Sequence, residues 1–145
     1  MRHIPTVLRV LLGLVFLTFG LNHFVPFRPA QPPPPPGVMA FVGALVTSHL
    51  LTLVKAVEVV AGLMLLGNRF VPLALALLAP IVVGIVWFHA VLAPEGIAVG
   101  LFVLALELGL AFLHRDAFLP MLRARHAAAV PASHRGDAVA TAASA

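Results

Sequence analysis

The chain has 145 residues, of which 61% are hydrophobic and 10% are charged, and its mean hydropathy is +1.08. Soluble domains are about 45–50% apolar and about 25% charged, so this composition excludes an ordinary water-soluble globule and, still more clearly, a disordered chain. The length allows one domain. The absence of cysteine excludes disulfides, iron–sulfur ligation, c-type haem attachment and thiol catalysis. The formal charge of +4 comes from basic residues dispersed between apolar runs, which indicates membrane orientation rather than nucleic-acid binding.

Four apolar runs suit a membrane span, which needs about 20 helical residues. These runs lie near residues 6–25, 49–66, 70–92 and 97–113. A fifth apolar stretch, 38–47, is too short to span, and we expect either an interfacial helix or an extension of the second run. The predicted fold class is therefore all-α, a bundle of four transmembrane helices within residues 1–125.

The charges between the runs predict the orientation of the bundle. Arg2 and Arg9 come before or at the start of the first run, and Arg69 lies between the second and third. Arg115, Arg123 and Arg125 follow the fourth run. The opposite side carries only Arg28 and Glu95. Since positive residues stay in the cytoplasm, both termini are expected there, and an even number of spans predicts the same.

Two segments outside the runs have a distinctive composition. Residues 26–37 contain five consecutive prolines, which predict an external polyproline II strap between the first two spans; docking of a partner is the alternative. Beyond Arg125 the chain is alanine-rich and polar, so residues 126–145 are expected to form a disordered cytoplasmic tail. The short links around Asn68 and Glu95 predict that consecutive spans run antiparallel.

Charged residues inside the apolar runs are costly, about 2.5–3.5 kcal/mol each at mid-bilayer, so they normally face the bundle interior and have partners. Lys55 and Glu58 are three apart and share a helix face. At 1.5 Å per residue, Glu58 lies about 14 Å and Glu107 about 15 Å below the outer surface. We therefore expect a buried cluster of Lys55, Glu58 and Glu107. The cluster is either a structural ion pair that specifies which helices meet, or a proton-handling or quinone-facing site.

Small residues and a proline suggest where helices approach or bend. Gly62 is predicted to let a neighbouring backbone come close, and Gly96 and Gly100 match a helix-dimer pattern. Pro80 is expected to kink the third span, with Gly84 one turn later. At this kink we favour ordinary packing over a small cavity.

Four polar residues are predicted to lie together at the outer rim: Asn22, His23, His49 and His89. Three imidazoles could bind a metal or, in pairs, a haem iron, but histidine is also common at helix ends as an interfacial group. No two of them have a compact ligand spacing, so we predict no metal site.

The segment from Leu8 to Phe24, LRVLLGLVFLTFGLNHF, resembles the opening of the DoxX family of small bacterial membrane proteins. The resemblance covers residues 7–122 and rests further on Lys55-Ala56-Val57-Glu58 with Gly62, Pro72-Leu73-Ala74, Ala79-Pro80-Ile81, Phe88-His89, Glu107 and Arg115-Asp116-Ala117-Phe118.

The resemblance implies a four-helix bundle of the bacterial inner (cytoplasmic) membrane, in a family whose members mostly have no known function. Some relatives are associated with quinone-linked sulfur oxidation or with oxidative-stress complexes at the membrane. Carried onto this chain, the family's polar positions match His23, Lys55, Glu58, His89 and Glu107.

The sequence thus predicts a multi-pass protein that serves as the membrane subunit of a quinone-linked redox system. Its cofactor would be quinone, and its partners the lipid bilayer and a redox enzyme or further copies of itself. Whether it is an enzyme stays open. The alternatives are a non-enzymatic scaffold that recruits soluble partners and a small oligomeric permease.

Overall fold

The computed structural model describes residues 3–27, 29 and 33–122, and in this part of the chain every regular element is helical. The α-helices are α1 (Ile4–Phe24), α2 (Pro36–Thr47), α3 (Leu50–Leu66), α4 (Val71–Val91), α5 (Ile97–Leu113) and α6 (Arg115–Phe118), with 3-10 turns η1 (Pro94–Gly96) and η2 (Leu119–Leu122). The predicted all-α class is confirmed. The predicted tail over 126–145 and part of the proline-rich loop lie outside the described residues.

Prolines and left-handed residues set where the helices begin. Three helices have proline in their first two positions, where the missing N–H has no helical partner to lose: Pro5 in α1, Pro36 in α2 and Pro72 in α4. The proline-rich segment therefore ends two residues earlier than predicted, because Pro36 and Gly37 already belong to α2. Phe70, with φ of 55°, precedes α4 and completes the short reversal after α3.

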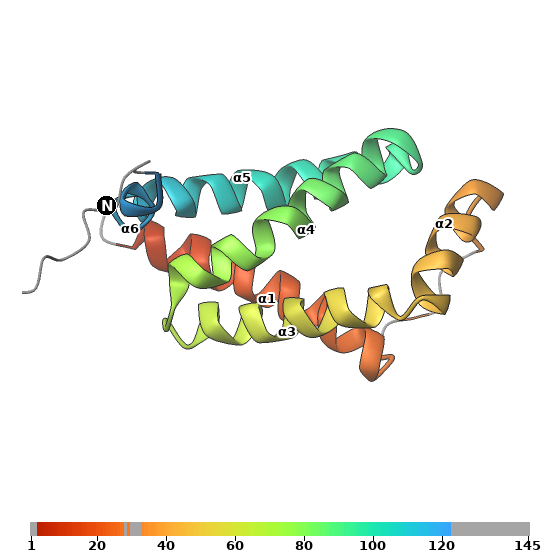
Figure 1. The fold of residues 1–145 in the computed structure, drawn as a ribbon, viewed down its shortest axis with the longest axis horizontal. Coiled ribbons are helices and arrows are strands. Elements are labelled where there is room, and N and C mark those ends of the chain that lie inside the picture. Colours follow the sequence, from red (N-terminus) through yellow and green to blue (C-terminus); the bar gives the residue numbers. More distant parts are fainter. Residues whose placement is uncertain (1–2, 28, 30–32, 123–145) are drawn as a thin grey trace, which may run out of the picture.

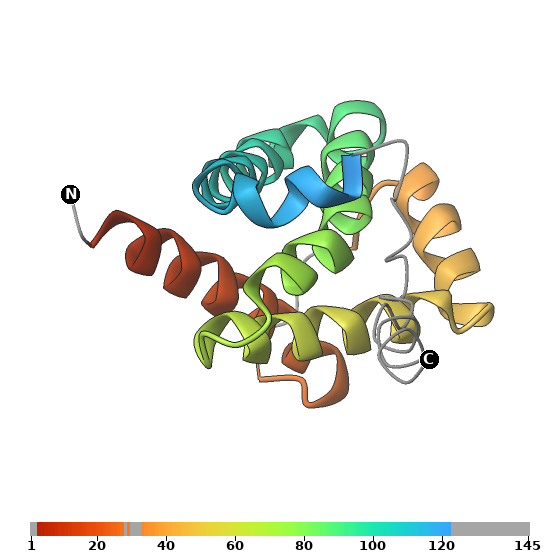
Figure 2. The ribbon, with the colours of Figure 1, turned by 60° about the vertical axis from the view of Figure 1, so that its left-hand side comes forward.

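The long helices form a closed bundle. α1 packs against α3 and α5, and α4 packs against the same two helices from the other side (Figures 1 and 2). The start of α1 and the end of α5 lie at one end of the bundle, where a Cβ added to Gly109 would be 3.4 Å from Leu8. Consecutive long helices therefore alternate in direction.

Glycines bring α1 and α3 into backbone contact. A Cβ added to Gly62 would lie 3.0 Å from the carbonyl oxygen of Gly13 and 3.0 Å from the backbone nitrogen of Leu17. The predicted close approach at Gly62 is thus confirmed. Gly96 and Gly100, which matched a helix-dimer pattern, allow close packing within this chain. A Cβ added to Gly96 would meet His89 of α4, and one added to Gly100 would meet Val86 of α4.

One arginine ties α1 to the end of α3. Arg9 donates hydrogen bonds through Nη1 to the carbonyl oxygens of Leu65 and, at 3.1 Å, of Leu66. These carbonyls belong to the last turn of α3, where the regular helical hydrogen bonds end; the carbonyl of Leu65 also accepts from the backbone N–H of Asn68 at 3.1 Å. The contact places the end of α3 beside the beginning of α1.

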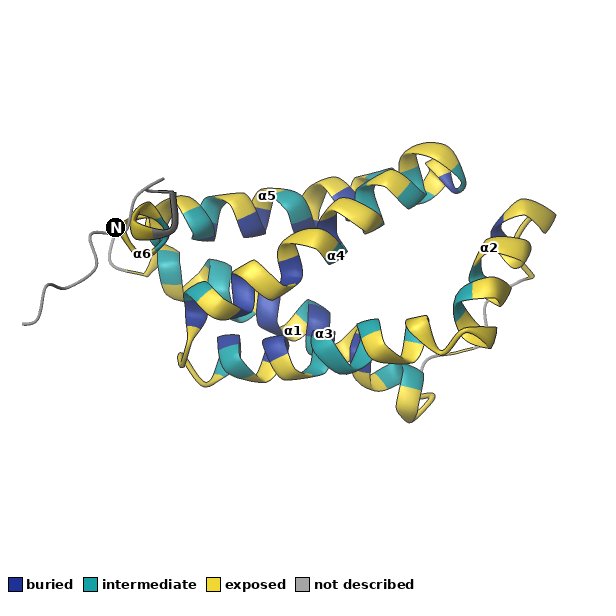
Figure 3. Cartoon of the chain, in the orientation of Figure 1, coloured by how far each residue is buried: buried dark blue, intermediate teal, exposed yellow. Residues whose placement is uncertain are grey.

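The outer surface of the bundle is apolar as well as its core. The core contains Leu12, Phe16, Leu65, Leu78 and Leu110, whereas many other large apolar side chains are exposed (Figure 3). Trp87, for example, is 71% exposed. A surface of this kind is stable in lipid and unfavourable in water.

Three helical segments are long and apolar enough to cross a membrane: α1, α4 and Pro94–Leu113. They correspond to three of the four predicted spans. The remaining predicted span, 49–66, corresponds to α3. This helix is long and apolar enough to cross a membrane only when it is taken together with α2, from which a bend of 80° separates it. The stretch 38–47 is therefore a separate helix and not a straight extension of the second span, because His49 adopts a left-handed φ of 58° between the two.

Candidate functional site

The centre of the candidate site is an ion pair on α3. Lys55 Nζ donates to Oε2 of Glu58 at 2.8 Å and to Oε1 at 2.9 Å, across one turn of the helix. The Glu58 side chain is 2% exposed and that of Lys55 is 22% exposed. Both carboxylate oxygens are therefore paired with a positive charge, which is the condition for keeping a carboxylate inside an apolar bundle.

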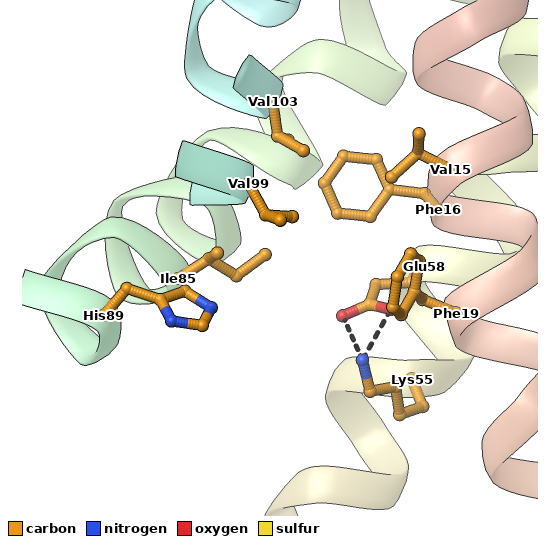
Figure 4. Close-up of a pocket in the computed structure, with 9 residues that line it drawn as sticks. All are labelled: Val15, Phe16, Phe19, Lys55, Glu58, Ile85, His89, Val99 and Val103. Carbon is orange, nitrogen blue, oxygen red and sulfur yellow. Dashed lines mark hydrogen bonds and ion pairs between the residues drawn. The ribbon is translucent and has the colours of Figure 1, made fainter. Parts of the chain in front are cut away.

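Helix α1 covers one side of this pair. Gly20 has no side chain, and a Cβ there would be 3.2 Å from the carbonyl oxygen of Lys55 and 2.8 Å from the side chain of Val59. Phe16 and Phe19 of α1 line the same cavity as the pair, and Phe19 lies beside Glu58 (Figure 4). Helix α1 and the ring of Phe19 thus shield the ion pair from the lipid on this side.

Two cavities meet at the ion pair. The first, of about 190 Å³, lies among α1, α3, α4 and α5, and we call it the α1 cavity. The second, of about 320 Å³, lies among α2, α3 and α4, and we call it the α2 cavity. Lys55, Glu58, Ile85 and His89 line both. The remaining walls are apolar, so the polar groups of the two cavities are concentrated at their junction.

His89 lies across the α1 cavity from the ion pair (Figure 4). Its Nδ1 is 3.1 Å from the carbonyl oxygen of Ala93. Because a carbonyl oxygen only accepts, Nδ1 carries the proton, and Nε2 of the neutral ring is an acceptor. The ring rests on Gly96, where an added Cβ would overlap it. Ala93 and Gly96 therefore fix the orientation of the imidazole.

The predicted group at the outer rim divides among three places. His23 Nε2 lies 3.2 Å from Thr52 Oγ1 and within electrostatic range of Glu58, and Asn22 Oδ1 accepts from the backbone N–H of Phe27 at 3.2 Å. His49 is exposed at the break between α2 and α3. Only His89 lines the cavities, and the described residues contain no group of three or more His, Cys, Asp or Glu suited to a metal ion.

Glu107 is buried on α5, but the structure does not bring it to the ion pair. It lines a third cavity, of about 210 Å³, which has no lining residue in common with the other two. Its Oε1 has no hydrogen-bond partner within the described part of the chain. Counting residues put Glu107 level with Glu58, but Glu107 is two residues from Gly109, which lies against Leu8 at the start of α1, whereas Lys55 lies against Gly20 near the end of α1. Val103, one turn earlier on the same side of α5, is the residue that lines the α1 cavity.

Three residues that line the α2 cavity were not predicted as site residues from the sequence: Phe41, Gly84 and Phe88. Gly84 lines the α2 cavity, and a Cβ there would meet nothing within 4 Å, so a cavity and not ordinary packing follows Pro80. Phe41 of α2 and Phe88 of α4 also line it, with ring centroids 5.8 Å apart and planes at 32°. The glycine one turn after Pro80 was the available signal for Gly84. Phe41 gave none, because its position depends on the bend before α3.

These features define a helical membrane protein whose polar groups meet at a buried ion pair between two apolar cavities. The sequence model of the DoxX family matches residues 4–91, which is more than half of the chain. The chain therefore belongs to the DoxX family, and the resemblance found in the sequence is confirmed. The match includes Lys55, Glu58 and His89, whereas α5 with Glu107 lies outside it. No curated protein and no solved structure matches the chain.

Proposed function

We propose that this DoxX-family protein binds a lipid-soluble quinone at the Lys55–Glu58 pair, as the membrane subunit of a redox system in the bacterial inner membrane. The observation that supports this most is the position of the ion pair at the junction of two apolar cavities. Small-molecule sites are typically apolar pockets with a few converging polar groups. A quinone, once bound, would supply reversible two-electron, two-proton chemistry.

The polar groups fit both forms of such a head group. Lys55 Nζ has three N–H donors, and two of them bond Glu58. The third is available to a quinone carbonyl oxygen. The Glu58 oxygens and Nε2 of His89 are acceptors, so they suit the hydroxyl groups of the reduced form.

The walls fit the apolar part of the molecule. An apolar cavity of about 150 Å³ holds benzene. The α2 cavity, of about 320 Å³, therefore has room for a substituted ring and the beginning of a hydrocarbon tail. The rings of Phe41 and Phe88 offer flat apolar surfaces to such a ring, and the missing side chain of Gly84 provides part of the space.

The test is to fill the cavity without disturbing the fold. Gly84→Leu puts a side chain into the α2 cavity where an added Cβ meets nothing. Gly43→Leu is the matched control, because Gly43 is also helical, also meets nothing within 4 Å and lines neither cavity. The full-length proteins are purified in mild detergent, and the quinone retained per protein is extracted and quantified.

We expect the unmodified protein and Gly43→Leu to retain quinone, and Gly84→Leu to lose most of it. Retention by all three at the level of an unrelated membrane protein would contradict the proposal, and so would equal retention by Gly84→Leu and the control. A scaffold would instead capture its soluble partner equally well with either variant, and a permease would show uptake into proteoliposomes.

A further inference from the structure

A third cavity lies on the other side of the bundle, between α4 and α5, and we call it the α4–α5 groove. It measures about 210 Å³. Its lining residues include Ala76, Ala79 and Val83 of α4 and Leu108 of α5, all of which are exposed on the outer surface. The groove is therefore open to the region that lipid occupies. Glu107, on its α5 wall, is the one charged residue among the described residues that line it.

The groove contains hydrogen-bond acceptors that lack donors. Glu107 is 5% exposed, and its Oε1 has no partner among the described residues. Pro80 has no N–H, so the carbonyl of Ala76, one turn earlier in the groove wall, lacks its usual helical donor. The side chains of the wall are otherwise apolar and donate nothing. The two cations within the spans have other partners: Arg9 donates to the carbonyls of Leu65 and Leu66, and Lys55 is bonded to both oxygens of Glu58.

We propose that the α4–α5 groove binds a lipid-soluble ammonium ion, a primary amine that carries an alicyclic or short alkyl group. The ammonium supplies the N–H donors that the Glu107 carboxylate and the Ala76 carbonyl lack, and its charge compensates the carboxylate. The apolar group fills the rest of the groove. Since about 150 Å³ is enough for benzene, 210 Å³ is enough for a cyclohexyl ring. A neutral alcohol of the same shape would leave the carboxylate charge uncompensated.

This site is independent of the proposed quinone site. None of Lys55, Glu58, Gly84 or His89 lines the groove, and Glu107 lines neither of the other cavities. Failure at one site therefore says nothing about the other.

The test uses a hydrophobic reagent for buried carboxyl groups, dicyclohexylcarbodiimide, on the full-length protein in mild detergent. The carboxyl proton moves to one carbodiimide nitrogen and the carboxylate oxygen adds to the central carbon, so the reagent is added whole and nothing leaves. Peptide mass spectrometry then measures the rate of labelling at each glutamate. Cyclohexylamine is the probe ligand, and cyclohexanol is its neutral counterpart.

We expect Glu107 to be labelled, and cyclohexylamine to slow that labelling about tenfold at concentrations where cyclohexanol has little effect, the change produced by about 1.4 kcal/mol of binding. Glu58, which is paired with Lys55, serves as the internal reference whose labelling the amine leaves unchanged. Glu107→Gln is expected to abolish labelling at this position.

A pair of variants tests whether the groove itself is the route. Ala79→Leu fills the groove, and Ala105→Leu adds the same side chain to an exposed position of α5 that lines none of the three cavities. We expect labelling to fall only with Ala79→Leu. The proposal is overturned if Glu107 is unreactive in the folded protein, if amine and alcohol protect it equally, or if both leucine variants react like the unmodified chain.

Discussion

Arg9 acts at a point where a single side chain joins two helices. Its guanidinium donates to the carbonyl oxygens of Leu65 and Leu66, in the final turn of α3. A cation at the end of a helix also interacts favourably with the helix dipole. In the sequence Arg9 indicates only the orientation of the bundle; in the structure it also holds the end of α3 against α1.

Replacing Arg9 tests that contact. Arg9→Met is expected to lower the free energy of unfolding by about 1.5–3 kcal/mol, the usual worth of a hydrogen bond to a charged group. Arg9→Lys keeps the charge but not the planar fork of donors, so its stability should fall between the two. Thermal unfolding of the purified proteins in the same detergent measures the order. A Met variant as stable as the unmodified protein would show that the contact contributes nothing.

The Lys55–Glu58 pair allows a second test by substitution. Lys55→Met leaves the buried Glu58 without a partner and is expected to cost about 3–5 kcal/mol. The double variant Lys55→Met, Glu58→Leu replaces both charges with apolar groups and should recover most of that loss. Unfolding of the single and double variants gives the coupling energy. If the double variant is as unstable as the single one, the pair is not compensating a buried charge.

The same double variant separates the two interpretations of the pair. A purely structural pair could be replaced without effect on quinone retention, since the helices still meet. A binding pair could not, because the head group would have lost its donor and its acceptor.

The contact between α1 and α3 depends on glycine in both helices. Gly62→Ala introduces a Cβ 3.0 Å from backbone atoms of Gly13 and Leu17, so the two helices must separate. We expect a loss of about 1–3 kcal/mol, as for other overpacked contacts. Gly43→Ala is the control: it meets nothing within 4 Å and should be neutral or stabilising by about 0.5–1 kcal/mol. Equal melting temperatures for the two variants would contradict the close packing.

The positions of the long helices could be predicted because long apolar runs define them. The predicted spans 70–92 and 97–113 agree closely with α4 and α5. The break between α2 and α3 gave no such signal, since the chain stays apolar on both sides of it. There the hydroxyl groups of Thr47 and Ser48 bond back to the carbonyls of Gly43 and Leu45, at 2.8 and 3.2 Å, and His49 turns the backbone.

The candidate site was predictable only in part, for a related reason. Spacing along one helix is enough to pair Lys55 with Glu58. Counting residues put Glu107 level with Glu58, but the level depends on how α5 is shifted along α1: Gly109 lies against Leu8, whereas Lys55 lies against Gly20. The position of His89, across the α1 cavity from the pair, depends on the packing of its ring on Gly96 of η1, which no local pattern specifies.

Across the whole molecule, the contacts require the long helices to alternate between two ends. The Arg9 contact places the turn after α3 beside the start of α1, and α5 ends near the same place. The 17 residues of α3 extend about 26 Å at 1.5 Å per residue, nearly the thickness of the hydrocarbon core. Although α3 is short, it therefore runs back beside α1 to the end where α1 began, which predicts four crossings with Asn68 and Glu95 on opposite faces.

Single cysteines can test this arrangement, because the chain has no cysteine of its own. Asn68 and Glu95 are both exposed in the links that flank α4. Since the arginine-rich end is expected in the cytoplasm, a membrane-impermeant maleimide should label Glu95→Cys in intact cells and Asn68→Cys only after permeabilisation. Labelling of both in intact cells would mean that α4 does not separate two faces of the membrane. The reverse pattern would keep the alternation and overturn the orientation, since the arginines would then face outward.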